Sequence, residues 1–525
     1  MHGVDMDNRE YLIGIDIGSS NVSMAVGVRN ENGELSILGV DVQKVEDCVK
    51  DGDIDNFILL GDAISKAKKA LESELHLQLN SAYVGISGRS VYCVRYEDYV
   101  DINERSGCVT DFEMRELNAR IDMVVPGGGD EIVDRILLRY NVDDRQGVQN
   151  PLGAFGKRLS ATYLFVMAGR VQIDRVKRAL HRADIRPNGL CVNPTLLPEL
   201  LLSADEKEAG VAIVDIGGDL TDIAVVREGK LCHFSSLPIG SSSINNDLRE
   251  FLKIPKKDID SLKHKFGAAV ASGVPENVTI PVKTAGHAKK QILQRNIAEI
   301  AEARLKDIAQ FVVRELKGSK FISKIPCGVV LTGGAVYLAN IDQLFAREMN
   351  MEVRFGDMLN GLDEVSQQSI CAYPQAAVMG LLLYGAKHSA CEAMPGVNGR
   401  VAVNPPVEDN ITTPEVNMFG DNSQENPIED ATKNIIENVG NGGDSTNGSG
   451  DTVVVEHTGE GNDEVEDNNG EDEGGENPGD GENGNSGEGG NNNGEDGANG
   501  STRPKGILGR IRDWIDKSFE QDQII

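Results

Sequence analysis

The chain has 525 residues, of which 83 are acidic and 52 basic, giving a formal net charge of −31. That length allows several domains, and we expect no nucleic-acid partner. Eight scattered cysteines without a Cys-x-x-Cys pair argue against a disulfide scaffold or a zinc site. We also expect no secretory leader and no transmembrane helix, because no apolar run reaches the required length.

The first predicted element is a strand–turn–strand unit at residues 11–27, which read YLIGIDIGSSNVSMAVG. Two apolar segments flank Asp16 and a Gly-Ser-Ser turn, a pattern that by itself is typical of a β-hairpin with a polar cap. The pattern recurs at residues 210–226, GVAIVDIGGDLTDIAVV, where Asp215 lies 199 residues after Asp16 without a gap. A repeat of this length is too long for a solenoid, so it predicts two related α/β lobes.

Two such turns facing each other are suited to a bound polyphosphate. Small residues let main-chain N–H groups approach an anion closely, and hydroxyl groups add further donors. Asp16 and Asp215, each at a strand end, suit a Mg²⁺ ion that keeps several waters and bridges phosphate oxygens. The predicted phosphate-turn residues are Gly18, Ser19, Ser20, Gly217, Gly218 and Thr221.

A third element lies at residues 328–350, where an apolar strand ends in a Thr-Gly-Gly turn and leads into an amphipathic helix. Alone, such a turn is typical of close packing. After two phosphate turns, we interpret Gly333 and Gly334 as the wall against which the adenosine of ATP lies.

A long acidic segment follows these elements. Residues 401–500 hold 25 Asp or Glu against one basic residue, Lys433, together with 20 glycines. Such a segment cannot bury enough apolar surface to offset the entropy of the chain. We therefore predict a disordered acidic linker over residues 389–502 and assign no partner to it.

Residues 503–525 predict an amphipathic helix. An apolar face with a tryptophan, flanked by Arg510, Arg512 and Lys517, is typical of an interfacial membrane anchor. Docking on the folded core or on a partner protein is the alternative, but the long linker favours a distant target, namely anionic membrane lipid. The apolar face consists of Ile507, Leu508, Ile511, Trp514, Ile515 and Phe519.

The three motifs, in this order, resemble those of the actin-like ATPase superfamily. Further stretches at residues 82–94, 149–166, 259–270 and 372–386 are similar to one branch of it, the FtsA family of bacterial cell-division proteins. The resemblance implies an ATP-binding protein that polymerises and binds the C-terminal peptide of FtsZ and other divisome proteins. It would tether the FtsZ ring to the inner face of the cytoplasmic membrane at the division site.

The resemblance also implies an actin-like two-lobed α/β fold with an inserted α/β subdomain, followed by the linker and the amphipathic helix. Inside the insertion, residues 126–130, PGGGD, predict a surface loop because residues 131–143 read as a strand. The expected parts are residues 1–81 with 164–205 (first lobe), 82–163 (insertion, with polymer contacts), 206–250 with 320–388 (second lobe) and 251–319 (small subdomain that binds FtsZ).

Three further residue predictions come from the resemblance. Lys263 aligns with a contact to the ribose and base, with an exposed helical lysine as the alternative. Asp219 stands where many relatives have a third glycine, so its carboxylate either repels phosphate or recruits metal. Asn193 aligns nearest to the water-positioning Glu or Gln of hydrolysing relatives and is a poor base, which predicts at most slow ATP hydrolysis.

The predicted FtsZ site lies where residues 289–316 show a strong helical pattern. Lys289, Lys290 and Arg295 lie near its start, where their charge and a helix N-terminus would attract an acidic peptide. A solvated basic turn is the alternative.

Rival functions would use the same nucleotide site, formed by the two phosphate turns and the Thr-Gly-Gly turn. A metabolic kinase of the superfamily would need a catalytic base and a substrate cleft, and a chaperone ATPase would continue into a β-rich peptide-binding domain. A pilus-assembly PilM-like ATPase typically ends where the linker begins here. The predicted C-terminal helix therefore favours the FtsA-like function.

Overall fold

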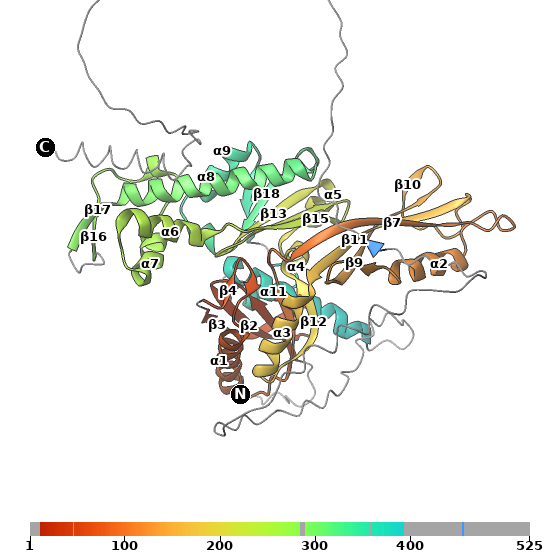
Figure 1. Cartoon of the computed structure of the whole chain (residues 1–525), viewed down its shortest axis with the longest axis horizontal. Coiled ribbons are helices and arrows are strands. Elements are labelled where there is room, and N and C mark those ends of the chain that lie inside the picture. The colour runs from red at the N-terminus through yellow and green to blue at the C-terminus, as the bar shows by residue number, and fades with distance from the viewer. Residues whose placement is uncertain are drawn as a thin grey trace, which may run out of the picture. The chain divides into compact units, whose positions relative to one another are not determined.

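The computed structural model of the chain describes residues 11–45, 47–283, 289–357, 359–370, 372–392 and 454–455. Most of the predicted linker, and the predicted amphipathic helix with its apolar side chains from Ile507 to Phe519, lie outside these residues. No helix within them is long and apolar enough to cross a membrane. The described elements form two α/β lobes and an inserted subdomain with its own sheet (Figure 1).

The first lobe is built on a five-stranded sheet. Its elements are β1 (Tyr11–Ile17), β2 (Asn21–Arg29), β3 (Leu35–Lys44), β4 (Val49–Lys50), β5 (Asp53–Ile54), α1 (Phe57–Leu75), β6 (Ser81–Ile86), α3 (Arg170–Arg182), β12 (Arg186–Val192) and α4 (Asn193–Leu201). The strands lie in the order β12-β6-β1-β2-β3, and β1 and β2 form the predicted antiparallel hairpin. Helix α1 packs against β2, β3 and α3.

The second lobe repeats this arrangement. Its elements are α5 (Ala204–Ala209), β13 (Val211–Ile216), β14 (Thr221–Arg227), β15 (Lys230–Leu237), η2 (Ile322–Lys324), β18 (Val329–Thr332), η3 (Gly334–Tyr337), α9 (Ile341–Met349), β19 (Val353–Phe355), α10 (Glu364–Ser369) and α11 (Ala372–Glu392). The order β15-β14-β13-β18-β19 again places an antiparallel three-stranded unit beside two parallel strands. The prediction of two related lobes is confirmed.

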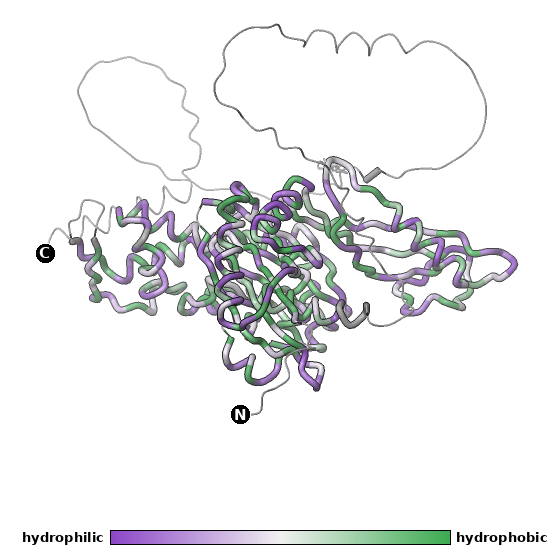
Figure 2. The backbone as a smooth tube through the Cα atoms, turned by 90° about the horizontal axis from the view of Figure 1, so that it is seen from below, coloured by the Kyte–Doolittle hydropathy of each residue, from purple (hydrophilic) through white to green (hydrophobic). Residues whose placement is uncertain are grey.

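One hydrophobic core joins the two sheets. Ile15 of the first sheet and Ile213 of the second belong to the same buried cluster, together with Leu197 of α4 and Met379 of α11. The segment 376–386, which the sequence predicted as a buried helix, is the buried part of α11. Figure 2 shows hydrophobic stretches gathered inside the lobes and hydrophilic ones along the outside. This shared core fixes the ends of β1 and β13 near each other.

The inserted subdomain has a separate four-stranded sheet with the order β10-β9-β11-β7. Its elements are β7 (Val91–Asp101), α2 (Asp111–Asp122), β8 (Val125–Pro126), β9 (Asp130–Val142), β10 (Arg145–Val148) and β11 (Arg158–Gly169), and β8 pairs in parallel with β20 (Val454–Val455). The strand predicted at 131–143 is β9, which confirms that prediction. Gly128 and Gly129, with φ of 72° and 88°, form the turn before it.

The boundaries of the insertion differ from the predicted 82 and 163. Strand β6 belongs to the first-lobe sheet, whereas β11 of the insertion continues to Gly169. Only the four residues from Ser87 to Ser90 separate β6 from β7. Alternation of apolar residues identifies a strand but does not tell which of two adjoining sheets it enters.

The small subdomain of the second lobe corrects one predicted element. Its elements are α6 (Ser241–Leu252), α7 (Lys256–Phe266), η1 (Ala271–Gly273), β16 (Thr279–Lys283), β17 (Lys289–Leu293) and α8 (Gln294–Gly318). The helix predicted from residue 289 was wrong at its start, because Lys289 and Lys290 lie on β17 and α8 begins only at Gln294. Ile292 lies opposite Ile280 of β16 and both are buried, so pairing in a hairpin overrides the helical pattern.

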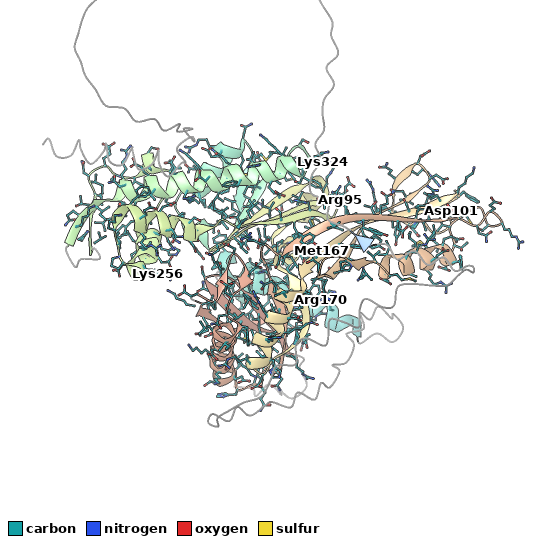
Figure 3. All side chains as sticks on the ribbon, viewed as in Figure 1. Arg95, Asp101, Met167, Arg170, Lys256 and Lys324 are labelled. Carbon is teal, nitrogen blue, oxygen red and sulfur yellow. The ribbon has the colours of Figure 1, made fainter. Side chains whose placement is uncertain are left out.

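A polar cluster around His233 of β15 joins the insertion to the second lobe. Its Nε2 lies 3.0 Å from Glu315 Oε1 of α8, and its Nδ1 lies 3.7 Å from Cys93 Sγ of β7. Cys93 also contacts the main chain of Phe234, and nearby Arg95 (Figure 3) donates to a main-chain carbonyl of β15. Burial by itself lowers the pKa of His233, but the hydrogen bonds with Cys93 and Glu315 raise it to about 9.

This cluster predicts a pH-dependent stability. A histidine whose folded pKa is raised stabilises the fold fully below its unfolded pKa, and that contribution is lost as pH rises through about 9. We expect His233→Gln to lower the free energy of unfolding by about 1–3 kcal/mol at pH 7 and by little at pH 10. Urea unfolding at the two pH values measures this, with His181→Gln, an exposed histidine of α3, as the control. Parallel losses at both pH values would contradict the ion pair.

Candidate functional site

Two aspartates occupy equivalent positions at the ends of the paired hairpins. Asp16 is the last residue but one of β1, and Asp215 is the last but one of β13. Asp215 lies opposite Asp222 of β14, whereas Asp16 lies opposite Ser23 of β2. The sequence analysis missed Asp222, although a carboxylate in the buried strand after Thr221 was a signal for it.

Burial shapes the electrostatics of these carboxylates. It raises the pKa of Asp16 to about 6; a hydrogen bond from Asn193 opposes the rise and the charge of Asp222 adds to it. Burial, followed by the charges of Asp222 and Asp16, raises the pKa of Asp215 well above its usual range. Burial also raises the pKa of Asp222. The site therefore concentrates negative charge that a bound cation would stabilise.

The two predicted phosphate turns have the same local geometry and touch each other. The Gly18 N–H donates to Asn21 O at 3.0 Å, and the Gly217 N–H donates to Leu220 O at 2.9 Å. Across the lobes, the Asp219 N–H donates to Ser19 Oγ at 3.0 Å.

Gly218 lies close to both serine hydroxyls of the first turn. A Cβ there would lie 2.1 Å from Ser20 Oγ and 3.0 Å from Ser19 Oγ, so a larger residue would have to displace these hydroxyls. The two hydroxyls therefore point at the opposite turn. The structure brings Ser19, Ser20 and Gly218 together as predicted.

Thr221 has a different role from the predicted one. Its hydroxyl donates to Ile239 O at 2.7 Å and its side chain is fully buried, so it holds the connection to α6. The first N–H groups of α6 are also used locally, because Ser241 and Ser242 donate to the carbonyls of Gly217 and Gly218 at 2.9 and 2.8 Å. Helix α6 therefore positions the second turn.

The two predicted wall glycines lie at the end of β18. Gly333 has φ of 91°, and a Cβ on it would lie 2.2 Å from Asp215 Oδ1, so this position requires glycine and sits directly against the carboxylate. A Cβ on Gly334 would meet no atom within 4 Å. Open space beside Gly334 and close packing at Gly333 fit a flat base or ribose against this turn.

Lys263 is a buried residue of α7, not the exposed lysine of the alternative interpretation. Its side chain is 4% exposed, and its Nζ pairs with Asp260 Oδ1 at 3.1 Å. Burial lowers its pKa, against the effect of Asp260. The structure places it beside its own helix neighbour, so its contact with a nucleotide stays a prediction.

Asn193, the first residue of α4, lies in the site. Its Nδ2 donates to Asp16 Oδ1 at 2.7 Å, although the two residues are 177 positions apart. Its Oδ1 is buried and makes no hydrogen bond within the described residues. An amide held in this way orients Asp16 and leaves one acceptor for another group.

Arg295, the remaining residue of the predicted peptide site, is already paired. Its guanidinium contacts Glu276 and, at 3.2 Å, Glu299. Lys289 and Lys290 lie on the neighbouring strand β17. The positive charge of Arg295 is therefore compensated locally, and an acidic peptide would have to compete with these carboxylates.

The residues present fit Mg²⁺ with a polyphosphate. Within the described residues, no group of three or more His, Cys, Asp or Glu is arranged as a closed metal site. Mg²⁺ needs fewer protein ligands because it retains waters, and Asp16 and Asp215 supply carboxylates at both turns. The unpaired Asn193 Oδ1 adds a water-binding acceptor, and Ser19 and Ser20 face the space between the turns.

The repeated sheets and paired turns define an actin-like protein with an inserted sheet. A family model described as "Cell division protein FtsA" matches residues 212–376, and one described as "SHS2 domain inserted in FTSA" matches residues 88–167. The second range agrees with the insertion from β7 to β11.

Curated relatives agree. The chain is 28% identical over 379 residues to the cell division protein FtsA of Pseudomonas aeruginosa, covering 72% of this chain and 89% of that one. It is 29% identical over 352 residues to FtsA of Bacillus subtilis, covering 66% and 79%. Two family models and these curated relatives therefore agree that the chain is similar to FtsA cell-division proteins.

One solved structure shares the fold at low sequence identity. The "PilM-PilN type IV pilus biogenesis complex" matches with a TM-score of 0.50 and 14% identity, covering 72% of this chain and 99% of that chain. At this identity, the likeness shows the fold alone.

The raised pKa of Asp16 predicts that its ionised form lowers the stability of the fold at neutral pH. A carboxyl whose folded pKa is raised to about 6 stabilises the fold at low pH, and that contribution is lost as pH rises from about 4 to 6. We expect Asp16→Asn to raise the free energy of unfolding by about 1–2 kcal/mol at pH 7.5 and not at pH 4. If the Asn193 side-chain amide flips, its Oδ1, which makes no hydrogen bond in the wild type, accepts one from the new side-chain amide at position 16. Urea unfolding measures this, and a variant that is destabilised at pH 7.5 would contradict the assignment.

Proposed function

We propose that this chain is an ATP-binding cell-division protein that polymerises and tethers FtsZ to the cytoplasmic face of the cytoplasmic membrane at the division site. The observation that carries the nucleotide part is the contact between the two Asp-bearing turns, through Ser19 and the Asp219 N–H. The similarity to the FtsA family model and to curated FtsA proteins supports the cell-division part.

ATP binds between the two lobes in this proposal. Main-chain N–H groups and the Ser19 and Ser20 hydroxyls hold phosphate oxygens, and Asp16 and Asp215 hold Mg²⁺ through its waters. Mg²⁺ supplies charge neutralisation for the phosphates. Gly333 and Gly334 receive the adenosine, and Lys263 approaches the ribose. Because the turns contact each other directly, the lobes must part for the polyphosphate to enter.

ATP serves mainly as a structural switch. Asn193 aligns nearest to the water-positioning Glu or Gln of hydrolysing relatives, but its side chain is shorter and its Nδ2 is already bonded to Asp16. This supports slow hydrolysis at most, so the bound nucleotide would control lobe closure and filament contacts for long periods.

The partner surfaces follow the domain organisation. The insertion supplies filament contacts, and the small subdomain with β17 and the start of α8 binds the acidic C-terminal peptide of FtsZ. Arg295 would have to exchange Glu276 for the peptide, which makes the interaction sensitive to salt. Other divisome proteins bind the assembled filament.

The C-terminal residues 503–525 bind anionic lipid. Their sequence pattern supports a helix lying in the membrane interface, with Trp514 at the level of the headgroups. A flexible linker of about 100 residues spans roughly 50–60 Å, so a filament can stand away from the bilayer. Burying a few apolar side chains at ~1.5–3 kcal/mol each gives modest binding of one copy, so firm attachment needs many copies on one polymer.

A PilM-like pilus-assembly ATPase is the second candidate, because that fold is similar. A metabolic kinase of the superfamily is a third. The family match of the insertion favours the cell-division function over both.

The proposed ATP site between the two turns is tested by the effect of ATP and Mg²⁺ on the thermal stability of the protein. ATP with Mg²⁺ at about 100 times its Kd should stabilise the wild-type protein by about 2.7 kcal/mol, which raises its melting temperature. Asp215→Ala should fold but lose most of that gain, because one of the two Mg²⁺ carboxylates is gone. Differential scanning calorimetry measures both, and an unchanged ATP effect in the variant would remove Asp215 from the site.

The membrane anchor is tested by sedimentation with anionic vesicles. Truncation after Thr502, or Trp514→Glu, should abolish co-sedimentation because the apolar face is lost or carries a buried charge. ATP and FtsZ binding should persist in both variants. Truncated protein that still sediments as fully as the wild type would show that another part of the chain binds lipid.

A further inference from the structure

The tip of the hairpin of β4 and β5 contacts the second turn. The Asp51 N–H at its tip lies 3.5 Å from Asp219 Oδ2, and Asp219 is the residue whose N–H reaches Ser19. Gly52, with φ of 81°, packs directly on the main chain of Gly88, where a Cβ would lie 2.4 Å from the Gly88 Cα. The segment Ser87–Ser90 therefore lies at the same end of the site as the two turns.

Arg89 belongs to this segment, and its guanidinium lies beside the Asp51 carboxylate. Its NH1 lies 3.5 Å from Asp51 Oδ2, and the Arg89 N–H also donates to the Asp51 carbonyl. The side chain is 61% exposed, and among the described residues Asp51 is its one side-chain partner. An exposed ion pair with a single contact is weak, and most donors of the guanidinium remain available.

A terminal phosphate is a better partner for this guanidinium than Asp51. Phosphate carries more charge than a carboxylate and accepts two parallel N–H bonds from the planar fork of arginine. Asp51 and Asp219 together place two carboxylates near the same space, so a phosphate entering it needs a compensating cation. Arg89 contacts Asp51 directly, and Asp51 in turn contacts Asp219.

We propose that Arg89 binds the terminal phosphate of ATP by exchanging Asp51 for it, and that this exchange reports the nucleotide state to the inserted subdomain. The inference rests on the proposed ATP site and adds a residue that distinguishes the triphosphate from the diphosphate.

The second part of the proposal follows from where Arg89 lies in the chain. It stands between β6 of the first lobe and β7 of the insertion. The Val91 N–H donates to Gly88 O at 3.1 Å, and the Gly169 N–H at the end of β11 donates to Ser90 O at 3.0 Å. Both strands that connect the insertion to the lobe are thus bonded to this short segment. Figure 3 places Met167 and Arg170 at this end of the insertion and Asp101 at the other.

The phosphate contact is tested by isothermal titration calorimetry with Mg²⁺–ATP and Mg²⁺–ADP. Arg89→Ala should weaken ATP binding about 10–100-fold and ADP binding by less than about threefold, because the lost bonds are charge-assisted and specific to the last phosphate. Arg89→Lys should recover part of the loss, because it keeps the charge but not the fork. Arg182→Ala, which removes another exposed ion pair of the first lobe, is the matched control and should change neither.

Asp51→Asn gives the opposite effect. It removes the competing carboxylate while asparagine tolerates the φ of 50° at this position. ATP should bind about 3–10-fold more tightly to this variant. Equal losses for ATP and ADP in Arg89→Ala, or no loss, would overturn the role of Arg89. Wild-type protein that binds neither nucleotide would overturn the ATP site itself.

The link to the insertion is tested by amide hydrogen exchange of the full chain. ATP should slow exchange of residues 87–93 and 167–170 more than ADP does in the wild type, and the difference should vanish in Arg89→Ala. The same exchange pattern with ATP and ADP in the wild type would overturn this part of the proposal.

Discussion

The three neighbouring carboxylates of Asp16, Asp215 and Asp222 are the constraint on which the rest of the site depends. They lie at the ends of paired strands, and burial and mutual repulsion raise their pKa values. Such a cluster costs stability in the isolated fold. A protein keeps it where a cation with its own anionic ligand restores the balance, as active sites commonly do. The glycines and hydroxyls around the cluster then have a clear use, because they leave room for that ligand.

The two lobes meet through this same region. One apolar core fixes the sheets, while beside the turns Asp219 forms cross-lobe hydrogen bonds with Ser19 and with the Asp51 N–H. A strong core beside a weak polar contact is the arrangement expected of a cleft that opens and closes about a fixed base. Gly218 permits the closed contact with the Ser20 hydroxyl as it stands, because a Cβ there would displace that hydroxyl.

The insertion is attached close to the cleft and held at a second place. Its strands leave the first lobe beside Arg89, and His233 with Glu315 and Cys93 joins it to the second lobe. A rigid sheet held at two points on different lobes must tilt when the lobes move. Closure of the lobes would therefore be converted into a change in the position of the insertion.

The sequence by itself determined the hairpins, their aspartates and the glycine turns, because alternation and turn chemistry depend on near neighbours. The exact 199-residue repeat also predicted two lobes. Only the tertiary structure decided that Asp222 joins the cluster and that Asn193 binds Asp16 across 177 positions. It likewise made residues 289–293 a strand, since Ile292 is buried against a partner strand. These features depend on segments that folding brings together, which no local pattern encodes.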